Sequence, residues 1–116
     1  MTTFKELHLD PGLARGIAER GYAELTDVQD QTLARTLRGE DVAVQSQTGT
    51  GKTAAFLITI FQKMLEAGPD ARKKALIISP TRELAVQIEG EANLLDRHLG
   101  FSVGAFYGGV GYATQL

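Results

Sequence analysis

The octapeptide SQTGTGKT, Ser46 to Thr53, constrains the fold of this chain more than any other stretch. A short β-rich run, DVAVQS, leads into it, and the apolar run TAAFLITIFQKML follows it. A strand, a glycine-containing loop and a helix in this order are typical of a loop that wraps phosphate groups. The sequence therefore predicts an α/β unit in which this loop joins the end of a strand to a helix N-terminus.

Each part of the loop has a chemical use. Gly49 and Gly51 allow the backbone N–H groups to face phosphate oxygens, and the helix N-terminus adds the positive end of its dipole. Lys52 is suited to the β and γ phosphates, and the Thr53 hydroxyl to a magnesium ion. The alternative is a turn that merely joins a strand to a helix, but such a turn does not require Gly-Lys-Thr. We favour a nucleotide site, in which Ser46 replaces the first glycine of the general pattern GxxxxGK[ST].

Helix-like and strand-like segments alternate along the chain, which predicts a parallel sheet with helices on both faces. Caps, apolar spacing and terminal glycines predict helices over residues 10–20, 27–38, 53–65 and 81–99. Strands are predicted over residues 41–46, 75–80 and 101–109, and 75–80 is the clearest buried one. Residues 68–74 are expected to form a polar connection, and residues 111–116 to begin another helix.

Composition narrows the function. At 116 residues the chain has the size of one compact unit or of a piece of a larger one. It has no cysteine, and His8 and His98 are too few and too scattered for a zinc site, so both are expected at the surface. Neither a leader sequence nor an apolar run near about 18 residues is present, which predicts a soluble, cytoplasmic protein without membrane contact. With a net charge of −2, nucleic-acid binding would need a local site.

Motifs on both sides of the loop resemble those of DEAD-box ATP-dependent RNA helicases, whose loop is usually written AxTGxGKT. GYAELTDVQ, which ends at Gln29, is similar to the adenine-reading Q motif, except that Leu25 stands where proline is usual. Phe4, 17 residues before Gly21, occupies the place of an isolated aromatic residue. PTRELAVQI, from Pro80, resembles the RNA-contacting motif Ia, and residues 108–109 resemble a glycine doublet. Together these matches cover almost the whole chain, 1–116.

The resemblance implies an incomplete parallel-sheet, RecA-like phosphate-loop domain that binds ATP and Mg²⁺ and contacts single-stranded or structured RNA through its sugar-phosphate backbone. The implied nucleotide-binding residues are Phe4, Tyr22, Thr26, Gln29, Ser46, Gln47, Thr48, Gly49, Thr50, Gly51, Lys52 and Thr53, the last also as the magnesium ligand. The implied RNA-binding residues are Pro80, Thr81, Arg82, Glu83, Gly108 and Gly109.

Several of these residues also have a structural interpretation. TDVQ is a capping box, in which Gln29 bonds the backbone of Thr26, and without the resemblance this interpretation is at least as good as adenine recognition. Tyr22 offers a flat face to a base but also suits packing, and we favour stacking. Phe4 either contacts the base region or attaches the N-terminus to the domain. Thr81 either caps a helix or, in the same geometry, helps to hold a phosphate.

The DEAD and SAT motifs and the second RecA-like domain of such helicases are absent from these 116 residues, and no catalytic residue is assigned. We expect nucleotide binding without hydrolysis or unwinding. We also expect open sheet edges and uncovered apolar faces, and so either a truncated first domain or completion by a partner chain, with self-association possible. Two alternatives remain: a standalone nucleotide-binding or small phosphotransferase module, and a folding unit that binds nothing.

Overall fold

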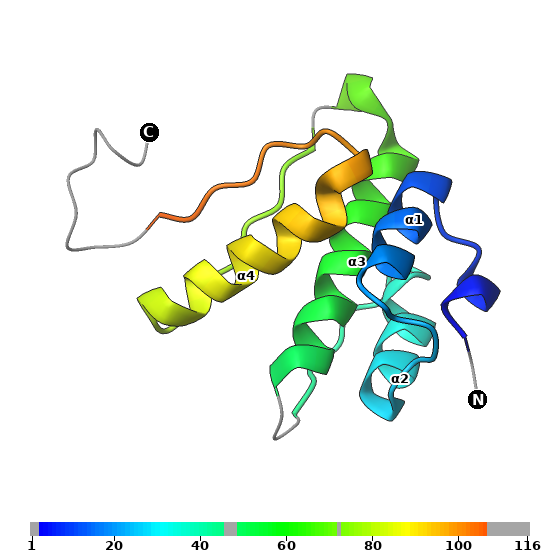
Figure 1. Cartoon of the computed structure of the whole chain (residues 1–116). Coiled ribbons are helices and arrows are strands. Elements are labelled where there is room, and N and C mark those ends of the chain that lie inside the picture. Colours follow the sequence, from blue (N-terminus) through cyan, green and yellow to red (C-terminus); the bar gives the residue numbers. More distant parts are fainter. Residues whose placement is uncertain (1–2, 46–48, 72, 107–116) are drawn as a thin grey trace.

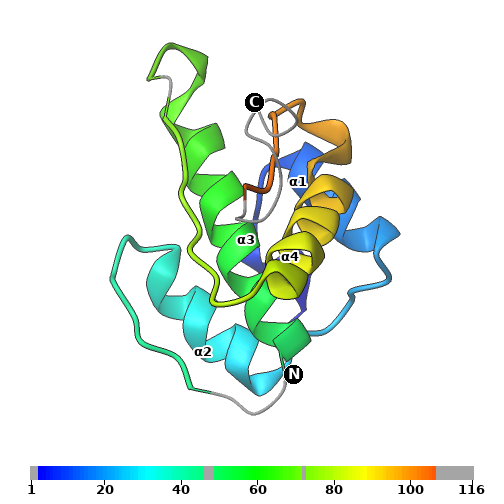
Figure 2. The same ribbon diagram turned by 90° about the vertical axis from the view of Figure 1, so that its left-hand side faces the viewer.

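The computed structural model describes residues 3–45, 49–71 and 73–106. Its helical elements are η1 (Phe4–Leu7), α1 (Pro11–Glu19), α2 (Asp27–Thr36), α3 (Gly49–Ala67), η2 (Pro69–Ala71), α4 (Arg82–Leu95) and η3 (Asp96–His98). Helix α3 runs through the middle of the molecule, and α1, α2 and α4 all contact it (Figure 1). A view turned by 90° shows α2 and α4 on different sides of α3 (Figure 2).

The first two predicted helices are confirmed, and local signals explain their limits. The Asp10 side chain accepts the Gly12 N–H at 2.9 Å and so caps α1, and a glycine at φ 81° follows the helix. Helix α2 begins at Asp27, as predicted, but ends at Thr36, and a turn continues to Gly39 at φ 87°. The left-handed backbone at these two glycines is one that residues with a side chain rarely adopt.

The other two predicted helices are also confirmed. Helix α3 is longer than the apolar run, because it begins at Gly49, inside the phosphate-loop motif. Thr81 caps α4 by accepting the Leu84 N–H at 3.1 Å, and the short η3 extends the helix toward Gly100 at φ 83°. The polar connection over residues 68–74 contains the single turn η2.

The core lies between the helices rather than against a sheet. Its fully buried large side chains are Leu13, Ile17, Leu33, Leu57, Ile58 and Leu95. Helices α1 and α4 approach closely at Gly16: a Cβ built on this glycine would lie only 2.8 Å from the carbonyl oxygen of Leu95. His98, at the end of η3, is half-buried and pairs with Glu19 of α1, so of the two histidines only His8 is exposed as predicted.

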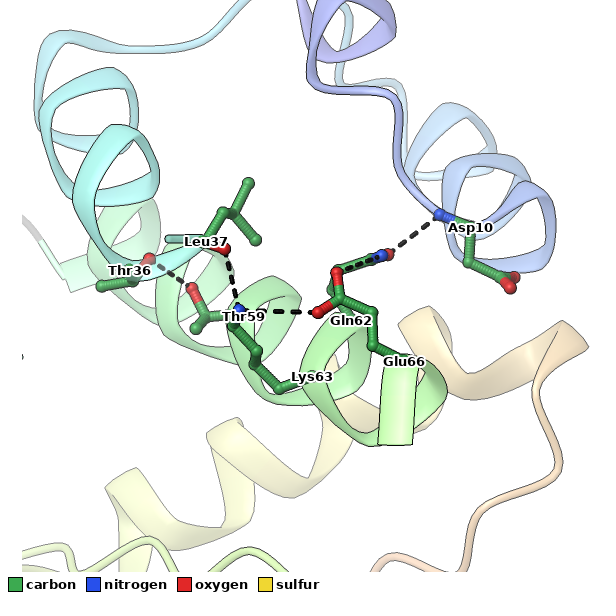
Figure 3. Close-up of polar contacts among 7 residues, drawn as sticks. All are labelled: Asp10, Thr36, Leu37, Thr59, Gln62, Lys63 and Glu66. Atoms are coloured by element: carbon green, nitrogen blue, oxygen red, sulfur yellow. Dashed lines mark hydrogen bonds and ion pairs between the residues drawn. The ribbon is translucent and has the colours of Figure 1, made fainter. Parts of the chain in front are cut away.

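Polar contacts join the start of α1 and the end of α2 to α3 (Figure 3). The hydrogen bonds are Thr36 Oγ1 with Thr59 Oγ1 at 2.7 Å, Lys63 Nζ to the Leu37 carbonyl at 2.8 Å, and the Asp10 N–H to Gln62 Oε1 at 2.9 Å. The lysine ammonium lies at the C-terminal end of α2, where the helix dipole favours a positive charge. These bonds fix the start of α1 and the end of α2 relative to the helix that begins in the phosphate loop.

The predicted parallel sheet is not confirmed. Within the described ranges no strand forms, and the only β-type pairing is an isolated antiparallel bridge between Thr3 and Glu24. The prediction that residues 75–80 are buried is wrong, because Leu76 and Ile78 are 85% and 86% exposed. Segment 101–106 alternates between half-buried and exposed residues, as a strand with one packed face would.

The physical reason is the lack of pairing. A strand needs a neighbour for its backbone N–H and C=O groups, and no ladder joins the described parts of the three predicted strands. Segments 75–80 and 101–106 instead line one groove of about 620 Å³, together with α3 and α4. Apolar side chains such as Leu76, Ile78 and Phe106 are therefore uncovered, which agrees with the expectation of uncovered apolar faces.

Candidate nucleotide-binding site

The Q-motif segment forms a complete capping box at the start of α2. The Gln29 N–H donates to Thr26 Oγ1 at 3.2 Å, and the Thr26 N–H donates to Gln29 Oε1 at 2.9 Å. Gln29 is only 4% exposed. The structural interpretation of TDVQ is therefore correct, and it fixes the glutamine side chain in one orientation.

The capping box lies directly against the first turn of α3. A Cβ built on Gly51 would lie 3.3 Å from Val28 Cγ1, 3.4 Å from Thr26 Oγ1 and 4.0 Å from Gln29 Nε2. Glycine at this position therefore permits the close approach of the two segments. The fold thus brings the predicted adenine-reading residues Thr26 and Gln29 beside the predicted phosphate loop, across more than twenty residues of sequence.

The phosphate loop is described only in part. Ser46, Gln47 and Thr48 lie outside the described residues, whereas Gly49 begins α3 and the backbone of Thr50 continues it. Lys52 and Thr53 are half-buried in the first turns of this helix. The lysine and the hydroxyl therefore lie at the positive end of the helix dipole, where anions are favoured.

Phe4 and Tyr22 form one aromatic pair. Their ring centroids are 6.0 Å apart with an interplanar angle of 24°, a stacked arrangement. Phe4 is 7% exposed, and its N–H donates to the Ala23 carbonyl at 3.0 Å. Phe4 thus attaches the N-terminal segment to the Q motif and lies beside the tyrosine that is predicted to stack on a base.

The predicted RNA-binding residues stand at the N-terminus of α4. Pro80, Arg82 and Glu83 are exposed, and the Thr81 side chain is engaged as the helix cap. Ser79 Oγ donates to the Thr81 carbonyl at 3.1 Å and supports the turn before the helix. The glycine doublet, Gly108 and Gly109, lies outside the described residues.

A charged cluster beside the aromatic pair was not predicted from the sequence. Glu91 of α4 forms an ion pair with Arg20, Nη2 to Oε2 at 2.7 Å, and accepts the Tyr22 hydroxyl at 2.9 Å. Desolvation, and then the hydrogen bond to Glu91, raise the pKa of Tyr22, and the same carboxylate raises the pKa of Arg20. One signal existed in the sequence: Glu91 has helical spacing from Ile88 and Leu95, so a charge falls on the apolar face of α4.

Among residues 3–45, 49–71 and 73–106, no group of three or more histidine, aspartate or glutamate side chains could hold a metal ion. None of the helices in those ranges is both long and apolar enough to cross a membrane.

Residues 26–116 match the sequence profile of the DEAD/DEAH box helicases. The chain belongs to this family, and the predicted resemblance is confirmed.

Individual relatives agree with this assignment. The chain is 43% identical to ATP-dependent RNA helicase RhlB of Pseudomonas aeruginosa, with 99% of the chain and 30% of that relative aligned. Among solved structures, it resembles the RNA-helicase Prp28 from Chaetomium thermophilum bound to ADP, with a TM-score of 0.83 and 34% sequence identity. This match covers 99% of this chain and 29% of that one. A hypothetical ATP-dependent RNA helicase from Sulfolobus tokodaii has a TM-score of 0.79 at 36% identity, over 92% of this chain and 30% of that one. The chain therefore spans less than a third of the length of these relatives.

Proposed function

We propose that this chain carries the adenine-nucleotide site of an ATP-dependent RNA helicase and part of its RNA-backbone site. One observation carries the proposal most directly: the capping box of Thr26 and Gln29 packs against Gly51 at the start of the phosphate-loop helix. A base reader and a phosphate binder must be this close for one nucleotide to reach both. The ADP bound to the related Prp28 structure supports the same type of ligand.

Gln29 is suited to read adenine while it caps α2. The cap uses its Oε1 and none of the N–H groups of Nε2. A carboxamide can therefore cap the helix and still donate to a base, and a second lone pair of the oxygen remains able to accept. The low exposure of Gln29 adds to this argument, because a polar group held away from water discriminates strongly between partners.

The phosphates belong at the N-terminus of α3. The loop backbone from Ser46 to Gly51 would surround the phosphate oxygens, and Lys52 would supply a positive charge to the β and γ phosphates. Thr53 fits Mg²⁺, which usually keeps several waters and uses few protein ligands, so a cluster of carboxylates is not needed to bind it. When bound, the ion would neutralise phosphate charge, and the hydroxyl of Thr53 would help to hold it.

RNA contact is proposed at the start of α4. Thr81 and Arg82 combine a helix N-terminus with a cationic fork, an arrangement that suits a phosphate or ribose of one strand. Glu83 and Pro80 shape the same turn, and residues 108–109 are proposed to add backbone contacts. Such contacts carry no base information, so the recognition would be independent of RNA sequence. Hydrolysis and unwinding are proposed for the longer helicases, and this chain is expected to bind nucleotide without turnover.

Titration with fluorescent ADP and GDP in the presence of Mg²⁺ tests the site. We expect the chain to prefer adenine, Lys52→Ala to lose both nucleotides, and Gln29→Glu to lose the preference. A glutamate can still accept the Thr26 N–H, so this variant keeps the cap but has no amide donor. Its charge acts on both nucleotides alike, so the ratio of the two affinities isolates base reading.

Three results would contradict the proposal. Equal signals from the wild type and Lys52→Ala would indicate a folding unit without a nucleotide site. An unchanged preference in both Gln29→Glu and Gln29→Ala would show that this residue only caps the helix. Nucleotide turnover by this chain alone would favour a standalone phosphotransferase module.

A further inference from the structure

The hydroxyl of Tyr22 is hydrogen-bonded to α4, a helix that lies outside both the Q motif and the phosphate loop. It donates to Glu91 Oε1 of α4 at 2.9 Å, across 69 residues of sequence. The ring is also stacked on Phe4, and the Arg20 guanidinium lies 5.5 Å from the ring centroid. The tyrosine is therefore held at its hydroxyl end and along its ring by three different partners.

Glu91 is itself fixed. Arg20 contacts both carboxylate oxygens, Nη2 to Oε2 at 2.7 Å and Nε to Oε1 at 3.3 Å, which is a bidentate arrangement. The side chain of Glu91 is 15% exposed and that of Arg20 is 34% exposed. A partly buried, forked ion pair of this kind restricts the carboxylate much more than a surface pair would. Oε1 thus faces the tyrosine hydroxyl in a defined direction.

The two helices that carry this ion pair cannot easily slide apart. Gly16 of α1 lies one helical turn before Arg20, and Leu95 of α4 lies one turn after Glu91. Gly16 and Leu95 form the close helix contact, with only 2.8 Å from a built Cβ to the carbonyl oxygen. The ion pair and this contact are therefore consecutive layers of the same α1–α4 interface.

We propose that Glu91 is a positioning residue for adenine binding, which acts by orienting the ring of Tyr22. This inference rests on the proposed function and extends it to a residue outside the Q motif, the phosphate loop and motif Ia. The carboxylate accepts a hydrogen bond from the Tyr22 hydroxyl and is itself paired with the Arg20 guanidinium. It therefore holds the tyrosine ring stacked on Phe4 before a nucleotide binds. A base then meets an aromatic face that has already lost its rotational freedom.

The expected effect follows from preorganisation. Ordering one mobile side chain on binding typically weakens affinity by a factor of about two to ten, and a ring ordered in advance avoids this loss. Removal of the Glu91 carboxylate should therefore weaken adenine binding by about that factor. The loss of ring order should not weaken the binding of pyrophosphate, because pyrophosphate has no base to stack on the ring.

Electrostatics predicts the opposite change, which makes the test decisive. Glu91 is negative and a nucleotide is strongly negative, so loss of the carboxylate charge alone would tighten binding of every phosphate ligand. A purely structural ion pair predicts a third pattern, in which loss of fold stability weakens all ligands together. Only a positioning role weakens ADP while pyrophosphate stays equal or binds more tightly.

The experiment compares Glu91→Gln with Glu89→Gln in this chain. Glu89 is the matched control because it lies on the same helix and accepts the Ala105 N–H rather than a group near Tyr22. Affinities for fluorescent ADP are measured directly, and those for pyrophosphate by competition. Tyr22→Phe keeps the ring without its hydroxyl and serves as the second variant, should Glu91→Gln fail to fold.

We expect Glu91→Gln and Tyr22→Phe each to weaken ADP about two- to tenfold, with pyrophosphate not weakened and Glu89→Gln unchanged. The double variant should be hardly weaker than either single one, because Tyr22→Phe removes the donor of this contact and Glu91→Gln removes the Arg20 ion pair that orients its acceptor. The inference is overturned if Glu91→Gln leaves ADP unchanged or weakens ADP and pyrophosphate equally. If Lys52→Ala binds like the wild type, the proposed function fails as well; if only Lys52→Ala weakens ADP, the site stands and this inference alone falls.

Discussion

The close contact between α1 and α4 gives the sharpest stability prediction. Gly16 and Gly90 are both interior helix residues, but their surroundings differ. A Cβ on Gly16 would meet the Leu95 carbonyl oxygen at 2.8 Å, whereas a Cβ on Gly90 would have nothing within 4 Å. Substitution of each glycine by alanine is therefore the same chemical change at a crowded site and at an open one.

The magnitude follows from two opposing terms. Alanine in place of glycine within a helix stabilises by about 0.5–1 kcal/mol, which should be the whole effect of Gly90→Ala. At Gly16 the neighbour is backbone, which cannot rotate away, so one helix must shift by several tenths of an ångström. Overpacking of this kind costs about 1–3 kcal/mol. Since the helix-propensity gain is common to both, Gly16→Ala should be less stable than Gly90→Ala by about 1–3 kcal/mol.

Thermal and urea unfolding, followed by circular dichroism at the helix band, measure the difference. For a chain of this length each kcal/mol corresponds to roughly 4 °C in Tm. We expect Gly90→Ala above the wild type and Gly16→Ala below it. The argument is refuted if Gly16→Ala is as stable as Gly90→Ala, because the two helices would then have room for a methyl group that the structure denies.

Three further predictions concern polar groups. Lys63→Met removes the bond to the Leu37 carbonyl and should lower the free energy of unfolding in urea by about 0.5–1.5 kcal/mol. Burial raises the pKa of Asp96 above its usual 3.8, so the folded state holds this proton more tightly than the unfolded state does. Stability therefore falls as the pH rises from 3.8 through the higher pKa of the folded state. Asp96→Asn keeps an acceptor for the Phe101 N–H, so the wild type should lose stability relative to this variant as the pH rises above 3.8, as paired urea titrations would show. Thr81→Ala should cost about 1 kcal/mol by loss of the α4 cap, whereas Thr81→Ser should cost much less in the same assay.

Helix positions were predictable because their signals are local. Asp10, Thr26 and Thr81 each cap a helix where the sequence predicted one, and a glycine with left-handed backbone follows each of the four long helices, after η3 in the case of α4. Such interactions span only a few residues, so the sequence contains both partners. The DEAD/DEAH box family was predictable for a related reason: its motifs are short and keep their order.

Burial and long-range contacts were not predictable in this way. The run ALIISP is apolar enough for a buried strand, but burial depends on which segments lie beside it. Leu76 lines the groove and is exposed, and Ile78 is exposed outside the groove lining. The contact of Glu91 with Tyr22 joins residues 69 positions apart. Its only trace in the sequence is a charge on an apolar helix face, a pattern that identifies an unusual residue but not its partner.

Helix α4 connects the two sites that the sequence suggested separately. Thr81 and Arg82 stand at its N-terminus, on the proposed RNA side, and Glu91 holds Tyr22 about 15 Å further along, since each helical residue advances about 1.5 Å. Because a helix of this length is stiff, a shift at one end would change the distance between Glu91 and the tyrosine hydroxyl. The close contact of Gly16 with Leu95 resists such a shift. Gly16→Ala should therefore weaken ADP more than pyrophosphate, as Glu91→Gln should, although Gly16 lies in no motif of the family.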